Sequence, residues 1–570
     1  MTKIIPYKQL MDAVEKIITD SSKEELGEIL KEMARQIPKE RRQYFLDQLH
    51  PYTRKEEPQA EKSIDGSLLN EVDEFIETLT MEMENREESD YEYDDDFYDE
   101  EDGEFYADFI MELENLFDQT DTAFDYKQFA IAKKAYEKLL QVLTLEDGFG
   151  SGIRQYDLGN ISLGNSLTRY YRAVLETEPT KDKAKVLFTK LQKYNEYEKG
   201  IPLKNIMSII SGEIYKNDTF LTEWIDMLKK EESPISDYYL REAVLLRDGI
   251  DGIKSLALSE GKKRPRAFLD WIKELMKIKD YESIFDVRKE VAGALDKELP
   301  IFSAISDLVK VAAERVGDEA LIEKSIWDAF FAKPDQDHLL TLWEYYKDKD
   351  DYLNLMVKAA QRIKNYLESK NSIFSIDSVE RDHAEQYARP SKFLLVHSYL
   401  FSKEWEKVLT IAKQEKEYGW SYSDNPQGLI LSGFLAIMIG QPIDKLPPNL
   451  KHLFENMLGD RYDFFHNKEE DSKLKKIYSE YLPTISLGDK EKEIIQWCID
   501  ICKRRVNYIV DNKNRKSYGK AATLIAACAE VLKKKGKNED AVNLISYAKN
   551  EFPRHRAFQG ELSSALSRLR

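Results

Sequence analysis

The chain has 570 residues, a net charge of −20 and 42% hydrophobic residues, which is enough apolar surface for large buried cores. This composition excludes a wholly disordered protein, and three cysteines in so long a chain exclude a disulfide-stapled scaffold. Charged residues make up 33% while glycine and proline are sparse, a balance that favours helix throughout.

The amino terminus predicts neither a signal peptide nor a membrane anchor. Its first residues, MTKIIPYKQLMDAVEKI, carry charges at helical spacing and lack a continuous apolar stretch. The most apolar window, Gly428–Gly440, has 13 residues, whereas a helix needs about 20 to cross a bilayer. We therefore expect a buried helix in that window and a protein that does not bind membranes. The low cysteine count fits the reducing cytoplasm, so we expect a cytoplasmic protein.

Residues 1–62 predict a small helical unit that ends in a linker. Ser22 and Glu25 have the spacing of a capping box, in which each side chain satisfies a free backbone N–H of the other residue. Apolar residues then recur on one helical face from Leu26 to Ala34.

Residues 63–126 are an acidic segment that we expect to be largely mobile, with 82–104 as its most charged part. Between Ser63 and Tyr126, 25 Asp and Glu face one basic residue, so this segment has a net charge of −24 and the rest sums to about +4. Dense like charge opposes compaction, while the interspersed aromatic rings keep a second option open, in which the segment docks on a basic, partly apolar surface. The predicted partner-binding residues here are Tyr91, Tyr93, Asp94, Asp95, Asp96, Phe97, Asp99, Glu100 and Glu101.

Downstream of the acidic segment, short polar turns alternate with apolar patterns of helical period. Pro300 and Pro334 lie 34 residues apart, which is the tetratricopeptide period. We expect an all-α fold of helical hairpins stacked as a tetratricopeptide-like solenoid with a disordered acidic insertion. The predicted turns are Lys279–Tyr281, Gly317–Asp318, Lys347–Asp351, Ser402–Glu404 and Lys535–Asn538.

A cluster of turn-forming residues at 419–428 predicts a boundary between a helical-repeat region, 127–420, and a carboxy-terminal region, 421–570. The polar loop 369–390 is the alternative to 419–428 as the place where the chain divides most easily. Exposed polar loops are where proteases cut first, so we expect cleavage near one of these two loops.

The segments RPRAFLDWIKEL (264–275) and SYGKAATLIAACAEVLKKKGKNEDAVNLISYAKNEFPRHRAF (517–558) resemble the carboxy-terminal helical region of prokaryotic SWIM zinc-finger proteins. The resemblance spans roughly residues 130–570. The zinc finger of that family needs a CxC pair followed by CxH, and no such arrangement occurs in this sequence. The resemblance implies the helical scaffold of that family without its metal module.

No motif in the sequence predicts catalysis, a cofactor or a metal site. The glycine-rich stretch 148–164 lacks the spacing of a phosphate-binding loop and is better read as a loop between helices. Cys498 and Cys502 share a helical face, but a zinc site needs two more ligands, so burial in the core is the stronger interpretation. The seven histidines are scattered singly, although a Ser-His-Asp arrangement assembled in space stays open.

The carboxy-terminal end carries a positive net charge, opposite in sign to that of the acidic segment. From Lys503 to Arg570, 16 Lys and Arg face 6 Asp and Glu, a net charge of +10. A solvated helix face is the main interpretation, with an acidic partner (including this chain's own 82–104) or nucleic acid as alternatives. The predicted basic patch consists of Lys503, Arg504, Arg505, Arg515, Lys516, Lys533, Lys534 and Lys535.

These observations together predict a non-enzymatic helical-repeat protein that binds a protein partner as a scaffold or regulator. By analogy with similar scaffolds, we place it in a prokaryotic regulatory or antiviral-defence system, including CRISPR-linked ones, with proteolysis as a control step. The alternative is a nucleic-acid-associated protein that binds through its basic carboxy-terminal end. The oligomeric state stays open.

Overall fold

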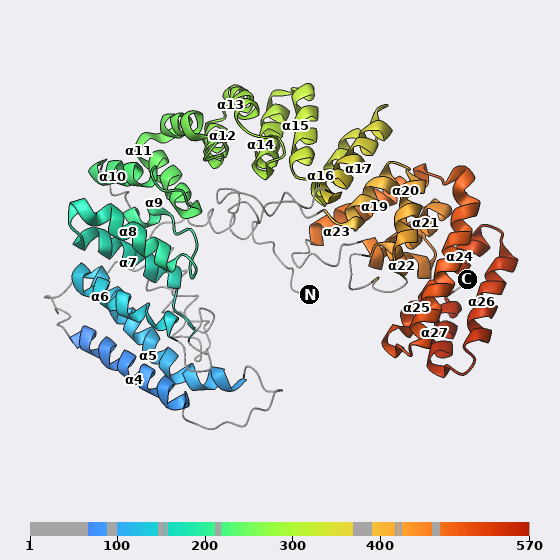
Figure 1. Ribbon diagram of the computed structural model, residues 1–570, viewed down its shortest axis with the longest axis horizontal. Coiled ribbons are helices and arrows are strands. Elements are labelled where there is room, and N and C mark those ends of the chain that lie inside the picture. The colour runs from blue at the N-terminus through green and yellow to red at the C-terminus, as the bar shows by residue number, and fades with distance from the viewer. Residues whose placement is uncertain are drawn as a thin grey trace, which may run out of the picture. The chain divides into compact units, whose positions relative to one another are not determined.

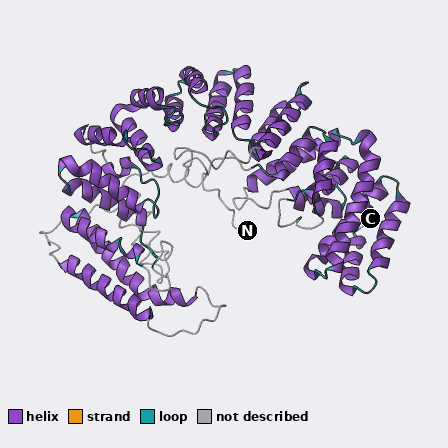
Figure 2. Ribbon diagram, viewed as in Figure 1, coloured by secondary structure: helices purple, strands orange, loops and turns teal. Residues whose placement is uncertain are grey.

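The computed structural model describes residues 67–87, 100–145, 153, 158–210, 218–368, 390–416, 420, 425–458 and 468–568. Within these ranges the chain forms 23 α-helices and no strand (Figure 2), so the expected all-α fold is confirmed. Residues 1–78 and 79–570 form separate compact units, and of the first unit the structure describes only the beginning of α4. The expected helical unit at 1–62 lies outside the described residues.

The helices of the first half of the chain are labelled in Figure 1. They are α4 (Ser67–Glu87), α5 (Glu100–Asp125), α6 (Phe129–Leu139), α7 (Leu163–Thr177), α8 (Thr180–Tyr194), α9 (Leu203–Ser208), α10 (Asp218–Leu228), α11 (Pro234–Glu260), α12 (Arg266–Ile278) and α13 (Tyr281–Ala294). The remaining helices are α14 (Pro300–Val316), α15 (Glu319–Ala332), α16 (Gln336–Tyr346), α17 (Tyr352–Glu368), α19 (Lys392–Phe401), α20 (Trp405–Gln414), α21 (Gln427–Ile439), α22 (Pro448–Leu458), α23 (Lys468–Tyr481), α24 (Glu491–Asp511), α25 (Tyr518–Lys534), α26 (Asn538–Glu551) and α27 (Arg556–Ser567).

Helix pairs recur at a nearly constant interval. Helix α14 begins 34 residues after α12, α16 begins 36 residues after α14, and α21 begins 35 residues after α19. The members of each pair pack together, as do α13 with α14 and α15 with α16, so every pair buries its apolar faces against sequence neighbours. This local packing is the pattern of a helical-repeat protein. Pro300 occupies the first turn of α14, where its missing N–H costs nothing, so it opens a helix.

At six places in the described chain, the same turn conformation joins two consecutive helices. A single residue adopts left-handed backbone angles, and the N–H of the next residue donates to the carbonyl five positions before it, at 2.8–3.1 Å. This 6→1 hydrogen bond satisfies a carbonyl that the helix end would otherwise leave free, as in a Schellman motif. The left-handed residues are Lys127, Lys279, Gly317, Lys403, Lys513 and Gly536. The sequence predicted four of these turns, and missed those at Lys127 and Lys513.

In two of these six pairs, the second helix is capped by the residue that follows the left-handed position. Asp280 accepts a hydrogen bond from Ser283 N at the start of α13, and Asp318 accepts one from Leu321 N at the start of α15. An aspartate at this position satisfies one of the free N–H groups of the first helical turn. A left-handed residue followed by Asp is therefore a compact signal for reversing the chain between two helices.

The expected boundary near residue 420 falls inside one hydrophobic core, which extends from Ala313 to Ala565. Trp420 Nε1 donates to Gln427 Oε1 at 3.0 Å, and Gln427 Nε2 donates to the Ala412 carbonyl at 3.0 Å. Tyr481 OH donates to the Leu400 carbonyl at 2.8 Å, so α23 is tied to α19 across the expected boundary. The turn-forming residues mark a local loop, but the helices on both sides share buried side chains. Residues 369–389 of the competing loop lie outside the described residues.

The acidic segment is more helical than expected. Helices α4 and α5 occupy most of residues 63–126, while residues 88–99 lie outside the described residues. In α4, apolar side chains at helical spacing (Leu68, Val72, Phe75, Leu79 and Met83) are buried. These two helices form because buried apolar side chains offset the repulsion between carboxylates on their other faces.

The apolar window 428–440 forms helix α21, which is buried on nearly all sides, as expected. Its neighbours α20 and α22 pack against it along the chain, and α24 and α25 also contact it. Among the described helices, none combines the length and the apolar character needed to cross a membrane.

Candidate functional site

The structure separates the predicted basic patch into three places. Lys503, Arg504 and Arg505 lie in the middle of α24, Arg515 and Lys516 lie in the turn before α25, and Lys533–Lys535 lie at the far end of α25. Helix α25 has 17 residues, so its two ends are about 25 Å apart. A single ligand of small size therefore cannot contact both ends.

The three cations in α24 and Lys535 already have neighbours within the fold. Lys503 Nζ lies 4.9 Å from the Tyr547 ring centroid, and the Arg505 guanidinium lies 5.1 Å from the centroid of Trp420. Such cation–π contacts hold the side chains against the helix surface. Lys535 Nζ forms an ion pair with Glu491 Oε2 at 2.8 Å. These contacts give the residues a structural role that the charge count could not show.

The predicted partner-binding residues from Tyr91 to Asp99 lie outside the described residues. Glu100 and Glu101 form the start of α5. The structure therefore leaves the acidic part of the prediction open.

The three cysteines are all buried in one part of the core. Cys498 and Cys502 on α24 lie one helical turn apart, and Cys528 lies on α25, which packs directly against α24. Burial raises the pKa of the Cys498 and Cys502 thiols well above the ordinary value. Thiols that stay protonated behave as small apolar core residues, which confirms the predicted burial. Among the described residues, no group of His, Cys, Asp and Glu is arranged to hold a metal ion.

A Ser-His-Asp arrangement does assemble in space, between α14 and α16. His338 Nδ1 lies 2.7 Å from Asp335 Oδ1, and His338 Nε2 lies 3.2 Å from Ser303 Oγ. A second carboxylate distinguishes this cluster from a catalytic triad, because Asp307 Oδ2 also lies 3.3 Å from Nε2. The serine is 2% exposed, so a substrate could not reach its hydroxyl without local opening.

The two carboxylates determine the protonation of the histidine. Burial alone would lower the pKa of His338, but its hydrogen bonds to Asp307 and Asp335 outweigh this effect and raise the pKa to about 10. At neutral pH both ring nitrogens therefore carry protons and donate, so Nε2 cannot accept the proton of Ser303. A general base requires the neutral ring, so the geometry supports a charged structural tie between α14 and α16.

Arg264 donates five hydrogen bonds within the described chain, and sequence reasoning did not single it out. Its side chain is buried at the carboxyl end of α10, where Nη2 donates to the carbonyls of Leu228, Lys229 and Glu231 at 3.4, 3.3 and 3.0 Å. The last carbonyls of a helix have no partner within the helix and carry partial negative charge. Arg264 therefore caps α10 from a residue more than thirty positions away.

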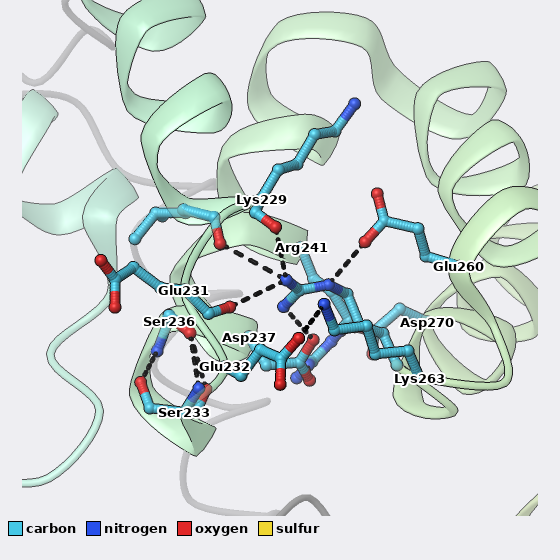
Figure 3. Close-up of polar contacts among 12 residues, drawn as sticks. Lys229, Glu231, Glu232, Ser233, Ser236, Asp237, Arg241, Glu260, Lys263 and Asp270 are labelled. Atoms are coloured by element: carbon cyan, nitrogen blue, oxygen red, sulfur yellow. Dashed lines mark hydrogen bonds and ion pairs between the residues drawn. The ribbon is translucent and has the colours of Figure 1, made fainter.

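The same guanidinium and its neighbour Arg241 share the carboxylate of Asp237 (Figure 3). Arg264 Nε donates to Glu260 Oε2 at 2.8 Å, and Arg264 Nη1 donates to Asp237 Oδ1 at 3.2 Å. Asp237 also pairs with Arg241, whose Nε donates to Asp270 Oδ2 at 2.7 Å. The network fixes α10, α11 and α12 against one another. Its only sequence signal is the spacing of four residues between each arginine and one of its carboxylates.

Exposed apolar side chains gather at the turns inside successive helix pairs. Ile278 and Val316 immediately precede the left-handed residues of α12–α13 and α14–α15, and are 64% and 51% exposed. Leu353 follows the turn of α16–α17 and is 43% exposed. Consecutive packed helices joined by short turns alternate in direction, so these three turns lie at the same end of their helices. We call Ile278, Val316 and Leu353 the apolar turn edge.

Comparisons with family models, curated proteins and solved structures find no match to this chain.

Proposed function

We propose that this chain is a non-enzymatic helical-repeat protein that binds a protein partner along the apolar turn edge. The recurrence of exposed apolar side chains at equivalent turns of three successive pairs is the observation that supports this most strongly. Isolated exposed apolar residues need no explanation, whereas their recurrence at equivalent turns of stacked helix pairs would give an extended partner regularly spaced contacts.

The polar clusters favour binding over catalysis. The Arg264 network and the His338 cluster use their charges to tie helices together, and their arginine and histidine side chains are largely buried. Repeat proteins that stack helix pairs present an extended surface to a peptide or a folded domain and need no catalytic group. The tetratricopeptide-like solenoid, the likeness to the helical part of SWIM proteins and a role in a prokaryotic regulatory or defence system belong to this proposal.

The experiment compares quantitative affinity capture from cells of the native host for three forms of the tagged chain. The first is wild type, the second carries Ile278→Ser, Val316→Ser and Leu353→Ser, and the third is a control. The control carries Met111→Ser, Leu258→Ser and Val542→Ser, which are equally exposed apolar residues of other helices. All six positions are exposed, so circular dichroism should be unchanged.

The proposal predicts that a protein retained by wild type and by the control is lost from the turn-edge variant. Retention of the same proteins by all three forms would contradict it, because the apolar turn edge would then play no part in binding. A catalytic activity that purified wild type shows and that Ser303→Ala removes would favour an enzyme.

A further inference from the structure

Two loops at one end of the carboxy-terminal helices are held together by aromatic contacts. Tyr518 begins α25, and its hydroxyl lies 3.4 Å from Nδ1 of His555, the residue before α27. The Tyr518 and Phe558 rings meet edge to face at 5.9 Å. The turn before α25 and the turn before α27 therefore share one surface, and α25 packs directly on α27.

Five exposed cations lie on these two turns, and we call them the basic end. They are Lys513, Arg515, Lys516, Arg554 and Arg556. None of them forms an ion pair with a described residue, in contrast to Lys535 at the opposite end of α25, which pairs with Glu491. Counting all charged residues of 511–520 and 549–561, seven Lys and Arg face Asp511, Glu551 and Glu561, a net charge of +4.

The surroundings of the basic end favour a phosphate backbone over a folded protein as the partner. The core of a protein–protein interface is rich in exposed aromatic and aliphatic side chains. No large exposed apolar side chain of the described residues falls within 511–520 or 549–561. Three of the five cations are arginines, whose planar forks match phosphate oxygens, and phosphate contacts need no apolar surroundings.

We propose that the basic end binds the phosphate backbone of nucleic acid without reading its sequence. Packed helices lie about 8–10 Å apart, and B-DNA carries one phosphate charge per about 1.7 Å of helix axis when both strands are counted. Several phosphates therefore lie within the span of the two turns. This surface is separate from the apolar turn edge and includes three residues, Lys513, Arg554 and Arg556, that lie outside the predicted basic patch.

The test measures binding of the full chain to a fluorescent DNA duplex by anisotropy across a salt series from about 50 to 200 mM. The test variant carries Arg515→Gln, Lys516→Gln and Arg554→Gln. A matched control carries Lys533→Gln, Lys534→Gln and Arg568→Gln, which removes the same charge at the opposite end of these helices, where all three residues are exposed. Arg556→Gln serves as a single-site variant that changes only the first residue of α27.

Wild type should bind with an affinity that falls log-linearly with salt. The test variant should lose about 10-fold or more in affinity, and the slope should fall by about 1 for each phosphate contact removed. The control should keep the wild-type slope, and Arg556→Gln should lower it by about 1. Absence of binding by wild type, equal losses in test variant and control, or preferential binding of fluorescent poly-L-glutamate would each overturn the proposal. Whether a protein partner binds the apolar turn edge does not affect this measurement. The experiment can therefore refute nucleic-acid binding without refuting the proposed function, and the reverse also holds.

Discussion

Replacing Arg264 by methionine tests whether the buried guanidinium holds α10, α11 and α12 together. The change keeps an extended side chain but leaves three carbonyls at the end of α10 and the carboxylate of Glu260 without their buried donor. Removing one partner of a buried ion pair costs about 3–5 kcal/mol. Because Asp237 keeps its contact with Arg241, we expect the lower part of this range, about 3 kcal/mol.

Hydrogen exchange read by mass spectrometry is the appropriate assay, because a long chain of helix pairs need not unfold in a single step. A local loss of about 3 kcal/mol accelerates exchange roughly 100-fold, and we expect this in the peptides that cover α10 and the start of α12. The adjacent residue supplies the control: Lys263 pairs with Glu232 in an exposed ion pair, so Lys263→Met should leave exchange unchanged. Equal effects of the two substitutions, or an Arg264→Met effect spread evenly over all helices, would refute the reasoning.

Three other predictions follow from the same geometry. The pKa of His338 is raised from 6.5 to about 10, so its contribution to stability is complete below pH 6.5 and is lost as the pH rises through about 10. The difference in unfolding free energy between wild type and His338→Gln should therefore shrink over that interval. A constant difference would contradict a charged ring that donates to both carboxylates. Lys279→Gly removes the steric strain of a lysine in the left-handed backbone conformation and should stabilise the chain by about 0.5–1 kcal/mol, while Gly317→Ala should destabilise it by about 1 kcal/mol. Both changes are measured by chemical denaturation, and the opposite signs would show that the turn tolerates side chains. Cys498 and Cys502 should react with a thiol reagent only at the rate of local opening, so labelling of the native protein within seconds would contradict their burial.

The sequence predicted the helical class and several turns because these depend on local chemistry. A left-handed residue followed by an N-capping aspartate, as at Lys279–Asp280, can be recognised from neighbouring residues alone. The turn at Lys127 was missed because neither Lys127 nor Gln128 is a turn-forming residue type, whereas Ser402 and Gly536 mark two of the predicted turns. The burial of the cysteines was also predictable, since their spacing and apolar surroundings are local features.

Features that depend on packing between distant helices were not predictable from local patterns. The basic residues near Arg515 and Lys533 look like one patch in a charge count, and only the length of α25 separates them. The expected boundary at 419–428 lies within one hydrophobic core, where Trp420 is held by a glutamine seven residues later and by the distant Arg505. Arg264 caps a helix that ends thirty-six residues earlier, a contact that no residue spacing along one helix can indicate.

The apolar turn edge is tested most directly by mapping hydrogen exchange of the chain with and without a protein recovered in the capture experiment. Our account predicts slower exchange in the bound state at the three turns that contain Ile278, Val316 and Leu353, with little change in the turns at the opposite end of the same helices. Protection confined to the basic end, or to helices outside α12–α17, would contradict the assignment of the partner to the apolar turn edge.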